Sequence, residues 1–272
     1  MNEILYASAK SIKEAIQNKK VSALEVVEAH LRRIEEVNPK LNAVVHLASD
    51  RALSEARKAD STMAKGELTG ILHGLPMTVK DSHDTQGLVS TGGTKGRETF
   101  VPESDATVVS RMRSEGAIVL GKTNTPELTL AFETDNLIYG RTNNPYDLDR
   151  TPGGSSGGAG AIIASGGSPV DLGTDTGGSV RVPSGFCGIS GLKPTSGRVP
   201  RTGHIISHSL GAIDSLTTVG PMARFVEDLA MVYPIISGPD WIDPAIVPMA
   251  LGNPADVDIK QLRVAYFTDI GN

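Results

Sequence analysis

Apolar side chains recur at three- and four-residue steps through much of the N-terminal quarter of the chain. This spacing predicts three amphipathic helices, over about residues 8–18, 22–37 and 48–64. Ser22 and Glu25 form a capping-box pattern at the start of the second helix, and Pro39 is expected to end it. We predict that residues 1–69 form a peripheral helical layer whose polar faces meet solvent.

From residue 70 onward, short apolar runs alternate with glycine-rich turns and helical segments. Strands are expected at about residues 74–80, 117–121, 169–172 and 262–267. Helices are expected at about residues 105–115, from residue 126, at 157–165 and at 224–236. Asp105 is expected to cap the first of these helices and Pro126 to begin the second. Strands that alternate with helices are typical of the α/β class, here with a largely parallel or mixed sheet. We predict one core over residues 70–272 and, because no helix covers the last expected strand, a missing C-terminal portion.

Composition narrows the class of protein. Hydrophobic residues make up 39% and charged residues 21% of the chain, as is ordinary for a soluble globular protein. A net charge of -5, the lack of a basic run and an aromatic content of 4% give no reason to expect nucleic acid as a partner. No apolar stretch has the length of a membrane span or of a signal peptide, so no membrane segment is expected.

The chain has one cysteine, Cys187, and therefore cannot form an intrachain disulfide. This fits a reducing compartment, and we expect a cytoplasmic location. Phe186 and Gly188 flank the cysteine, which favours a small buried residue over a nucleophile.

Two glycines precede a serine in the segment Gly173-Thr-Asp-Thr-Gly-Gly-Ser-Val-Arg181. The Gly177-Gly178 pair lets backbone N–H groups turn toward one point, and the Val-Arg-Val run after Ser179 is not typical of a flexible loop. This arrangement suits an oxyanion hole, in which backbone donors face the atom that becomes negative. A tight glycine turn with an incidental serine fits the segment alone equally well.

Two further segments carry polar groups in unusual places. Residues 152–158, Pro-Gly-Gly-Ser-Ser-Gly-Gly, lack the Gly-Lys-Ser/Thr of a phosphate loop, and they lead directly into an apolar small-residue helix, which a flexible linker seldom does. Lys80 ends an apolar strand, where loss of solvation would lower the pKa of its amine and let it act as a general base. A surface lysine that reaches past the strand also fits this position.

Other common catalytic arrangements find no match. The sequence has no G-x-S-x-G elbow, no H-E-x-x-H and no cluster of carboxylates with histidines, so neither a Ser-His-Asp triad nor a metal site is expected. Among the six histidines, only His83, close to Lys80, is kept as a reserve candidate. A hydrolase needs a nucleophile, a base and an anion site, and the three segments together supply them.

These segments resemble the amidase signature family. The resemblance rests on GGSSGG, on GTDTGGSVR and on FCGISGLKPTSGR at residues 186–198, and it runs from about residue 70 to the end of the chain. The sequences of two further segments, TNTPELTLAFETDNLIYGRTNNP and ASGGSP, are most similar to acylamidases of the fatty-acid-amide hydrolase type. The resemblance implies an α/β/α layered fold with a central mixed sheet, hydrolysis of a carboxylic amide without a cofactor, and a small-molecule amide as the substrate.

The resemblance also implies a Ser–cis-Ser–Lys triad. Ser179 would be the nucleophile, Ser155 the middle residue and Lys80 the terminal base. A cis peptide bond would join Ser155 to Gly154 or to Ser156, and the sequence does not show which. Neutral Lys80 would draw a proton through Ser155 from Ser179, and an acyl-enzyme would form.

Further residues receive implied roles from their positions in the motifs. The N–H groups that would hold the oxyanion are those of Thr176, Gly177, Gly178 and Ser179. Asp175 and Arg181 are expected to form a structural ion pair beneath the loop, and Ser156 to hydrogen-bond within the relay. The acyl-pocket stretch corresponds to Thr129, Leu130 and Phe132, for which plain helix packing is the alternative.

Three functions fit the sequence. Family members usually extend well beyond the 272 residues of this chain, and much of the substrate pocket comes from that later part. The favoured function is an amidase that acts on a small or acyl amide, with a homodimer left open. The second is the glutaminase subunit of a tRNA-dependent amidotransferase, which the wording SHDTQGLVS at residues 82–90 disfavours. The third is an inactive fragment or scaffold, which retention of all three triad positions disfavours.

Overall fold

A computed structural model describes residues 2–206, 215–266 and 268–269 of the chain. The helices are α1 (Asn2–Leu5), α2 (Ala9–Gln17), α3 (Ala23–Leu41), α4 (Ser49–Ala64), α5 (Thr107–Ser114), α6 (Gly157–Ala164), α7 (Arg181–Cys187) and α8 (Val226–Ile236). The strands are β1 (Val44–Leu47), β2 (Pro76–Lys80), β3 (Ile118–Thr123), β4 (Val170–Asp175), β5 (Ser190–Gly191) and β6 (Thr218–Ala223). Short 3₁₀ turns lie at Lys95–Arg97, Glu127–Thr129, Pro254–Asp256 and Ile259–Gln261.

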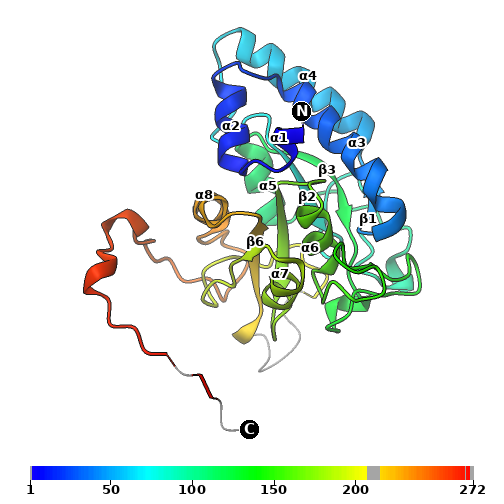
Figure 1. The fold of residues 1–272 in the computed structure, drawn as a ribbon, viewed down its shortest axis with the longest axis vertical. Helices are drawn as coiled ribbons and strands as arrows, with labels where there is room; N and C mark the ends of the chain where they lie inside the picture. Colours follow the sequence, from blue (N-terminus) through cyan, green and yellow to red (C-terminus); the bar gives the residue numbers. More distant parts are fainter. Residues whose placement is uncertain (1, 207–214, 267, 270–272) are drawn as a thin grey trace.

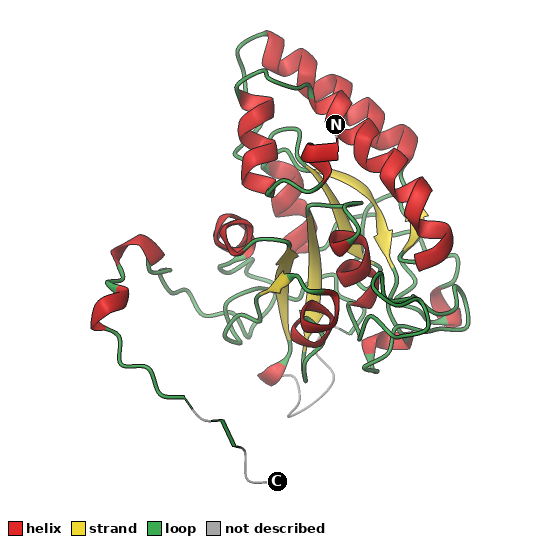
Figure 2. Ribbon diagram, viewed as in Figure 1, coloured by secondary structure: helices red, strands yellow, loops and turns green. Residues whose placement is uncertain are grey.

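The strands form two small ladders that meet through β2 and β4. In the first, with the order β1-β3-β2, β2 and β3 run parallel and β1 is antiparallel to β3. In the second, with the order β4-β6-β5, both pairs are antiparallel. Strands β2 and β4 lie next to each other, and the Thr78 hydroxyl donates to Asp171 at 2.6 Å across the junction. The predicted mixed α/β class is confirmed, with helices on both sides of the strands (Figure 2).

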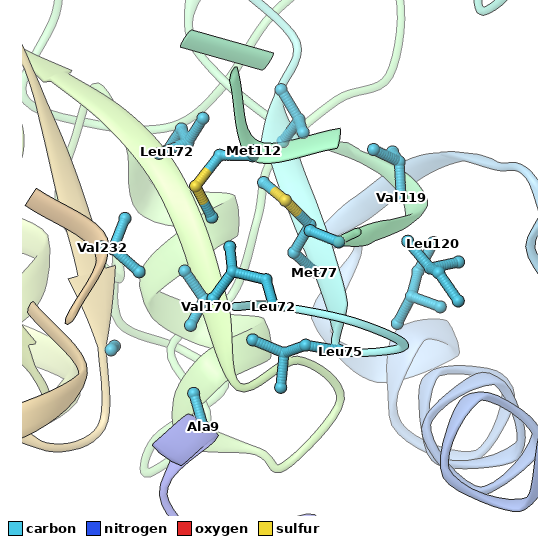
Figure 3. Packing of buried hydrophobic residues seen from close by; sticks show 14 of the residues in the cluster. Ala9, Leu72, Leu75, Met77, Met112, Val119, Leu120, Val170, Leu172 and Val232 are labelled. Carbon is cyan, nitrogen blue, oxygen red and sulfur yellow. The ribbon is translucent and has the colours of Figure 1, made fainter. Parts of the chain in front are cut away.

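Among the described residues, the larger of two hydrophobic clusters joins the two ladders to most of the helices. Figure 3 shows Met77 of β2, Met112 of α5 and Leu172 of β4 packed together in it. Ile12 and Ile34 of the N-terminal helices are fully buried in the same cluster. The N-terminal residues also supply β1, which was not expected, so the division at residues 69 and 70 stays a prediction.

The helices over residues 9–17, 23–41 and 49–64 form close to their predicted positions (Figure 1). Ser22 accepts a hydrogen bond from the Glu25 N–H at 3.1 Å and Glu25 returns one, so the capping box is confirmed. Pro39 does not end α3, contrary to expectation. It lies in the last turn, where a missing N–H removes a single intrahelical bond; the helix ends at Leu41 and is capped by Asn42 in a left-handed conformation.

Three other local expectations are wrong. Asp105 does not cap α5, because its carboxylate accepts from the Gln86 N–H and from Arg113. Pro126 begins only a 3₁₀ turn, because Leu128 takes a positive φ of 51° that breaks a helix. Residues 262–266 form no strand and are exposed, without a neighbouring strand to pair with among the described residues; Phe267 lies outside them.

Gly158 lets three segments meet behind the site. Its N–H donates to the Asn124 carbonyl at 3.2 Å, and the Asn124 N–H donates to the Ala43 carbonyl at 2.8 Å. A Cβ at Gly158 would lie 2.4 Å from the Asn124 nitrogen and 2.7 Å from the Ala43 oxygen, both backbone atoms. Only glycine allows the start of α6 to approach the ends of β3 and of the segment before β1.

We predict that Gly158→Ala lowers the free energy of unfolding by about 1–3 kcal/mol or more, because the backbone must shift to admit the methyl group. The matched control is Gly185→Ala in α7, where an added Cβ meets nothing within 4 Å. This variant should be neutral or stabilised by up to about 1 kcal/mol. Denaturant unfolding measures both, and equal stabilities of the two variants would contradict the close approach.

Candidate active site

Lys80 is the last residue of β2 and is fully buried. Its amine, Nζ, lies within hydrogen-bond distance of three hydroxyl oxygens: those of Ser155 at 2.7 Å, Ser156 at 3.0 Å and Thr174 at 2.9 Å. None of the three partners carries a charge. A neutral amine has two N–H donors and one lone pair, so it can donate to two of these hydroxyls and accept from the third.

Burial lowers the pKa of Lys80 to about 7, because the charged ammonium loses its hydration. The negative charges of Asp171 and Asp175 oppose this effect by favouring the ammonium. The balance brings the amine into the range in which a base can both take and return a proton near neutral pH. A surface lysine, the alternative that the sequence allowed, is excluded by this burial.

Ser155 joins the lysine to the second segment. The peptide bond between Gly154 and Ser155 is cis, so of the two bonds that the sequence left open it is the first. Ser156 follows with two contacts: its hydroxyl accepts from Lys80, and its N–H donates to the Ser179 carbonyl at 3.1 Å. The three predicted segments are therefore brought together in one place.

Ser179 lies in the turn between β4 and α7, 8% exposed, whereas Lys80 and Ser155 are at 0% and 1%. The serine is thus the member of the group that solvent and a substrate reach first. Within the described residues, the Ser179 hydroxyl has no hydrogen-bond partner, so the bond to Ser155 that a relay needs is not formed in this conformation. A rotation about χ1 changes the direction of a serine hydroxyl at small cost, and such bonds often tighten only with substrate bound.

Asp175 organises the turn that carries Ser179. Its two carboxylate oxygens accept from the N–H groups of Gly178, Val180 and Arg181 at 2.8, 3.0 and 3.2 Å. The Arg181 guanidinium adds two bonds at 2.9 and 3.0 Å, so the expected ion pair is present. These donors hold the pKa of the Asp175 carboxyl below its usual value in spite of burial.

This geometry corrects one expectation for the oxyanion donors. The Gly178 N–H is already bonded to the Asp175 carboxylate, so it is not free to face a substrate. The N–H groups of Thr176, Gly177 and Ser179 have no acceptor within the described residues. Gly178 has a φ of 136°, which makes glycine the residue that allows the turn at this point.

The expected acyl-pocket residues lie in an irregular segment. Leu130 and Phe132 are 64% and 60% exposed, which excludes plain helix packing for them. The Phe132 ring lies beside the turn that carries Ser179, since a Cβ at Gly177 would be 3.7 Å from its Cζ. Thr129 takes a positive φ of 62°, and none of its described hydrogen bonds reaches a serine of the site.

His83, the reserve candidate, makes no described side-chain hydrogen bond to Lys80 or to the serines of the site. His83 is buried, its ring centroid lies 5.3 Å from that of His204, and burial keeps its pKa well below the usual value, so it is neutral. Cys187 is also buried, which raises the pKa of its thiol to about 12. Within the described ranges, no three histidine, cysteine or acidic side chains cluster as a metal site would need.

Sequence reasoning missed Thr174 and Asp171, both on β4. Thr174 supplies the third hydroxyl around the lysine, and Asp171 is fully buried with its pKa raised by burial to about 6. One signal was available for Asp171, because a charged residue between Val170 and Leu172 contradicts the apolar pattern of a buried strand.

Comparison with known proteins agrees with this geometry. The family model described as Amidase matches residues 25–272, and the chain belongs to this family. No helix in the part of the chain that the structure describes is long and apolar enough to cross a membrane.

The chain is 42% identical over 265 residues to the A subunit of glutamyl-tRNA(Gln) amidotransferase from Sulfurihydrogenibium sp. (strain YO3AOP1), covering 96% of this chain and 54% of that protein. A bacterial aryl acylamidase of the amidase signature family superposes with a TM-score of 0.83 at 36% identity, over 90% of this chain and 50% of that one. Fatty acid amide hydrolase superposes with a TM-score of 0.85 at 28% identity, over 92% and 45%. The chain thus spans about half the length of the relatives it matches.

Proposed function

We propose that this chain carries the catalytic centre of an amidase that hydrolyses a carboxylic amide to an acid and ammonia or an amine. The observation that carries the proposal is the fully buried Lys80 amine with Ser155 at 2.7 Å and no carboxylate in contact among the described residues. A buried lysine without a paired anion is costly to keep charged, and it serves as a base when neutral.

In the proposed reaction, Lys80 takes a proton from Ser155 while Ser155 takes one from Ser179. The Ser179 oxygen bonds to the amide carbonyl carbon, and the carbonyl oxygen becomes negative. The N–H groups of Thr176, Gly177 and Ser179 are the donors available to hold this oxygen. The relay then returns the proton to the nitrogen as the carbon–nitrogen bond breaks, which leaves an acyl-enzyme on Ser179. Water adds to the acyl carbon through the same relay and releases the acid.

The supporting residues have distinct tasks in this proposal. Asp175 and Arg181 fix the nucleophile turn, and Ser156 orients the lysine and ties its own segment to the Ser179 carbonyl. The exposed ring of Phe132 beside Gly177 offers an apolar surface to the acyl group of a small-molecule amide. Thr129 lies in the same segment, and its part in substrate binding stays a prediction, as do a homodimer and a cytoplasmic location.

We predict that a fluorophosphonate probe labels the wild-type protein and Ser54→Ala, but not Ser179→Ala. Ser54 is an exposed helical serine, so its variant controls for the substitution itself. Lys80→Ala should abolish turnover, whereas Lys58→Ala on the surface of α4 should retain it. Labelling of Ser179→Ala at the wild-type rate would rule out the nucleophile. A folded wild type that takes no label would favour the inactive scaffold.

We predict that kcat/KM rises with pH through an ionisation near the pKa of Lys80, about 7. The sign follows from the base, because only the neutral amine accepts a proton and its fraction grows as pH increases. The rate should therefore increase about tenfold between pH 6 and pH 8. Initial rates on an amide substrate measure this, and a flat profile in an active enzyme would exclude lysine as the base.

A second function is favoured by the relatives from glutamyl-tRNA(Gln) amidotransferases, at 42% identity. We infer for this alternative that the Ser179 centre hydrolyses glutamine and that a partner protein uses the ammonia. Release of ammonia from glutamine, compared with release from simple acyl and aryl amides, separates the two. Turnover of simple amides with at most trace activity on glutamine is expected for the amidase. A preference for glutamine would assign the alternative.

A further inference from the structure

A buried carboxylate, Asp171, lies where the strands of the site converge. It is fully buried on β4, three residues before Thr174, whose hydroxyl is in contact with the Lys80 amine. One of its oxygens, Oδ2, accepts from the Thr78 hydroxyl at 2.6 Å and from the Thr123 hydroxyl at 3.0 Å. The other oxygen, Oδ1, is buried and has no hydrogen-bond partner among the described residues.

The two donors belong to the strands that hold the lysine. Thr78 lies two residues before Lys80 on β2, so both side chains point to the same face of the strand. Thr123 is the residue of β3 that pairs directly with Lys80 in the parallel ladder. Asp171 therefore ties β2 and β3 to β4 immediately next to the lysine, at the junction of the two ladders.

The two carboxylates near Lys80, those of Asp175 and Asp171, differ in how far other groups offset their negative charge. Asp175 accepts from three backbone N–H groups and pairs with the Arg181 guanidinium, which offsets its charge. Asp171 receives only two neutral hydroxyl donors, and its charge is not offset by any ion pair within the described residues. The largest favourable charge interaction of the Lys80 ammonium is accordingly with Asp171.

The other titratable groups around Lys80 and Asp171 do not replace Asp171 as the main negative charge that acts on the Lys80 ammonium. His83 and His204 are buried, and loss of hydration lowers both pKa values well below the usual range, so neither carries charge near neutral pH. Lys122, on β3, is also buried and acts on Asp171. Its amine donates to the His83 carbonyl and to Thr85, and Asp81 is its strongest acidic neighbour.

We propose that Asp171 is a positioning residue of the active site, whose buried carboxylate anchors the strands around Lys80 and places a negative charge close to its amine. This inference rests on the proposed role of Lys80 as the base. On this proposal, the pH at which kcat/KM falls on the acidic side of its pH profile, its acidic limb, is set in part by Asp171, which touches neither the substrate nor the reacting serines. The two groups titrate as a coupled pair, because protonating Asp171 removes the charge that stabilises the ammonium.

The experiment compares the kcat/KM–pH profiles of the intact wild-type protein and Asp171→Asn on one amide substrate. Asparagine keeps the shape and still accepts from the two threonines through its oxygen, but it carries no charge. Because the ammonium loses its stabilising partner, the acidic limb should move to lower pH by about half a unit or more. The gain in activity relative to the plateau should appear between about pH 6 and pH 8 and vanish at lower pH, where the wild-type carboxyl of Asp171, with a pKa of about 6, is protonated too.

Asp228→Asn is the matched control, because Asp228 is equally buried but binds the backbone N–H of Lys10 and does not act on Lys80. Its profile should coincide with wild type. If Asp171→Asn does not fold by thermal melting, Thr78→Val provides the second test. It removes one donor from the carboxylate, favours the neutral acid, and should shift the limb in the same direction by less.

Two failures are distinguishable. The role of Asp171 would be overturned if Asp171→Asn folds and its acidic limb lies at the same pH as that of wild type. If only Thr78→Val folds, the same result for that variant would overturn it. Either outcome would leave Lys80 as the base. An active wild type without an ionisation near pH 7, or one in which Ser179→Ala retains turnover, would overturn the proposed function itself.

Discussion

The arrangement of the site depends on one constraint: a lysine amine is held out of water and given hydroxyl groups instead of a carboxylate as contacts. Burial disfavours the ammonium, and the pKa of Lys80 falls to about 7. The hydroxyls of Ser155, Ser156 and Thr174 satisfy the amine in either protonation state. A direct carboxylate partner would have kept the lysine charged and unable to act as a base.

The fold supplies this environment by joining two strand ladders at the lysine. Lys80 is delivered by β2 and Thr174 by β4, and the serines come from the turn before α6. Gly158 allows that turn to approach the end of β3 closely. Asp175 accepts hydrogen bonds from backbone N–H groups of the turn that carries Ser179 and so fixes its conformation. The least buried member, Ser179, lies in the same turn as Gly177, beside which the ring of Phe132 is exposed.

The chemistry was easier to predict from the sequence than the strands that support it. Glycine-rich motifs are local, so the three segments could be picked out from the residues, whereas the triad that joins Lys80, Ser155 and Ser179 was implied by the family resemblance. Strand β6 could not, because Gly220 and Pro221 contradict a strand pattern although it pairs with β4 and β5. Helix α7 contains Pro183 and Gly185, which obscure it in the same way. The hydrogen bond from the Gly178 N–H to Asp175 could not be predicted from the spacing of residues in the sequence. The same is true of the negative charge of Asp171 near Lys80. Both depend on how the folded chain places these groups.

The central claim is that the Lys80 amine is neutral in a large fraction of molecules near neutral pH. The most direct test is an NMR titration of the lysine side chain in protein with labelled Nζ and Cε, with the resonance assigned by its loss in Lys80→Ala. The account predicts a midpoint at about 7 for this resonance, while exposed lysines titrate near 10.4. A Lys80 resonance that stays in the ammonium form to above about pH 10 would contradict it.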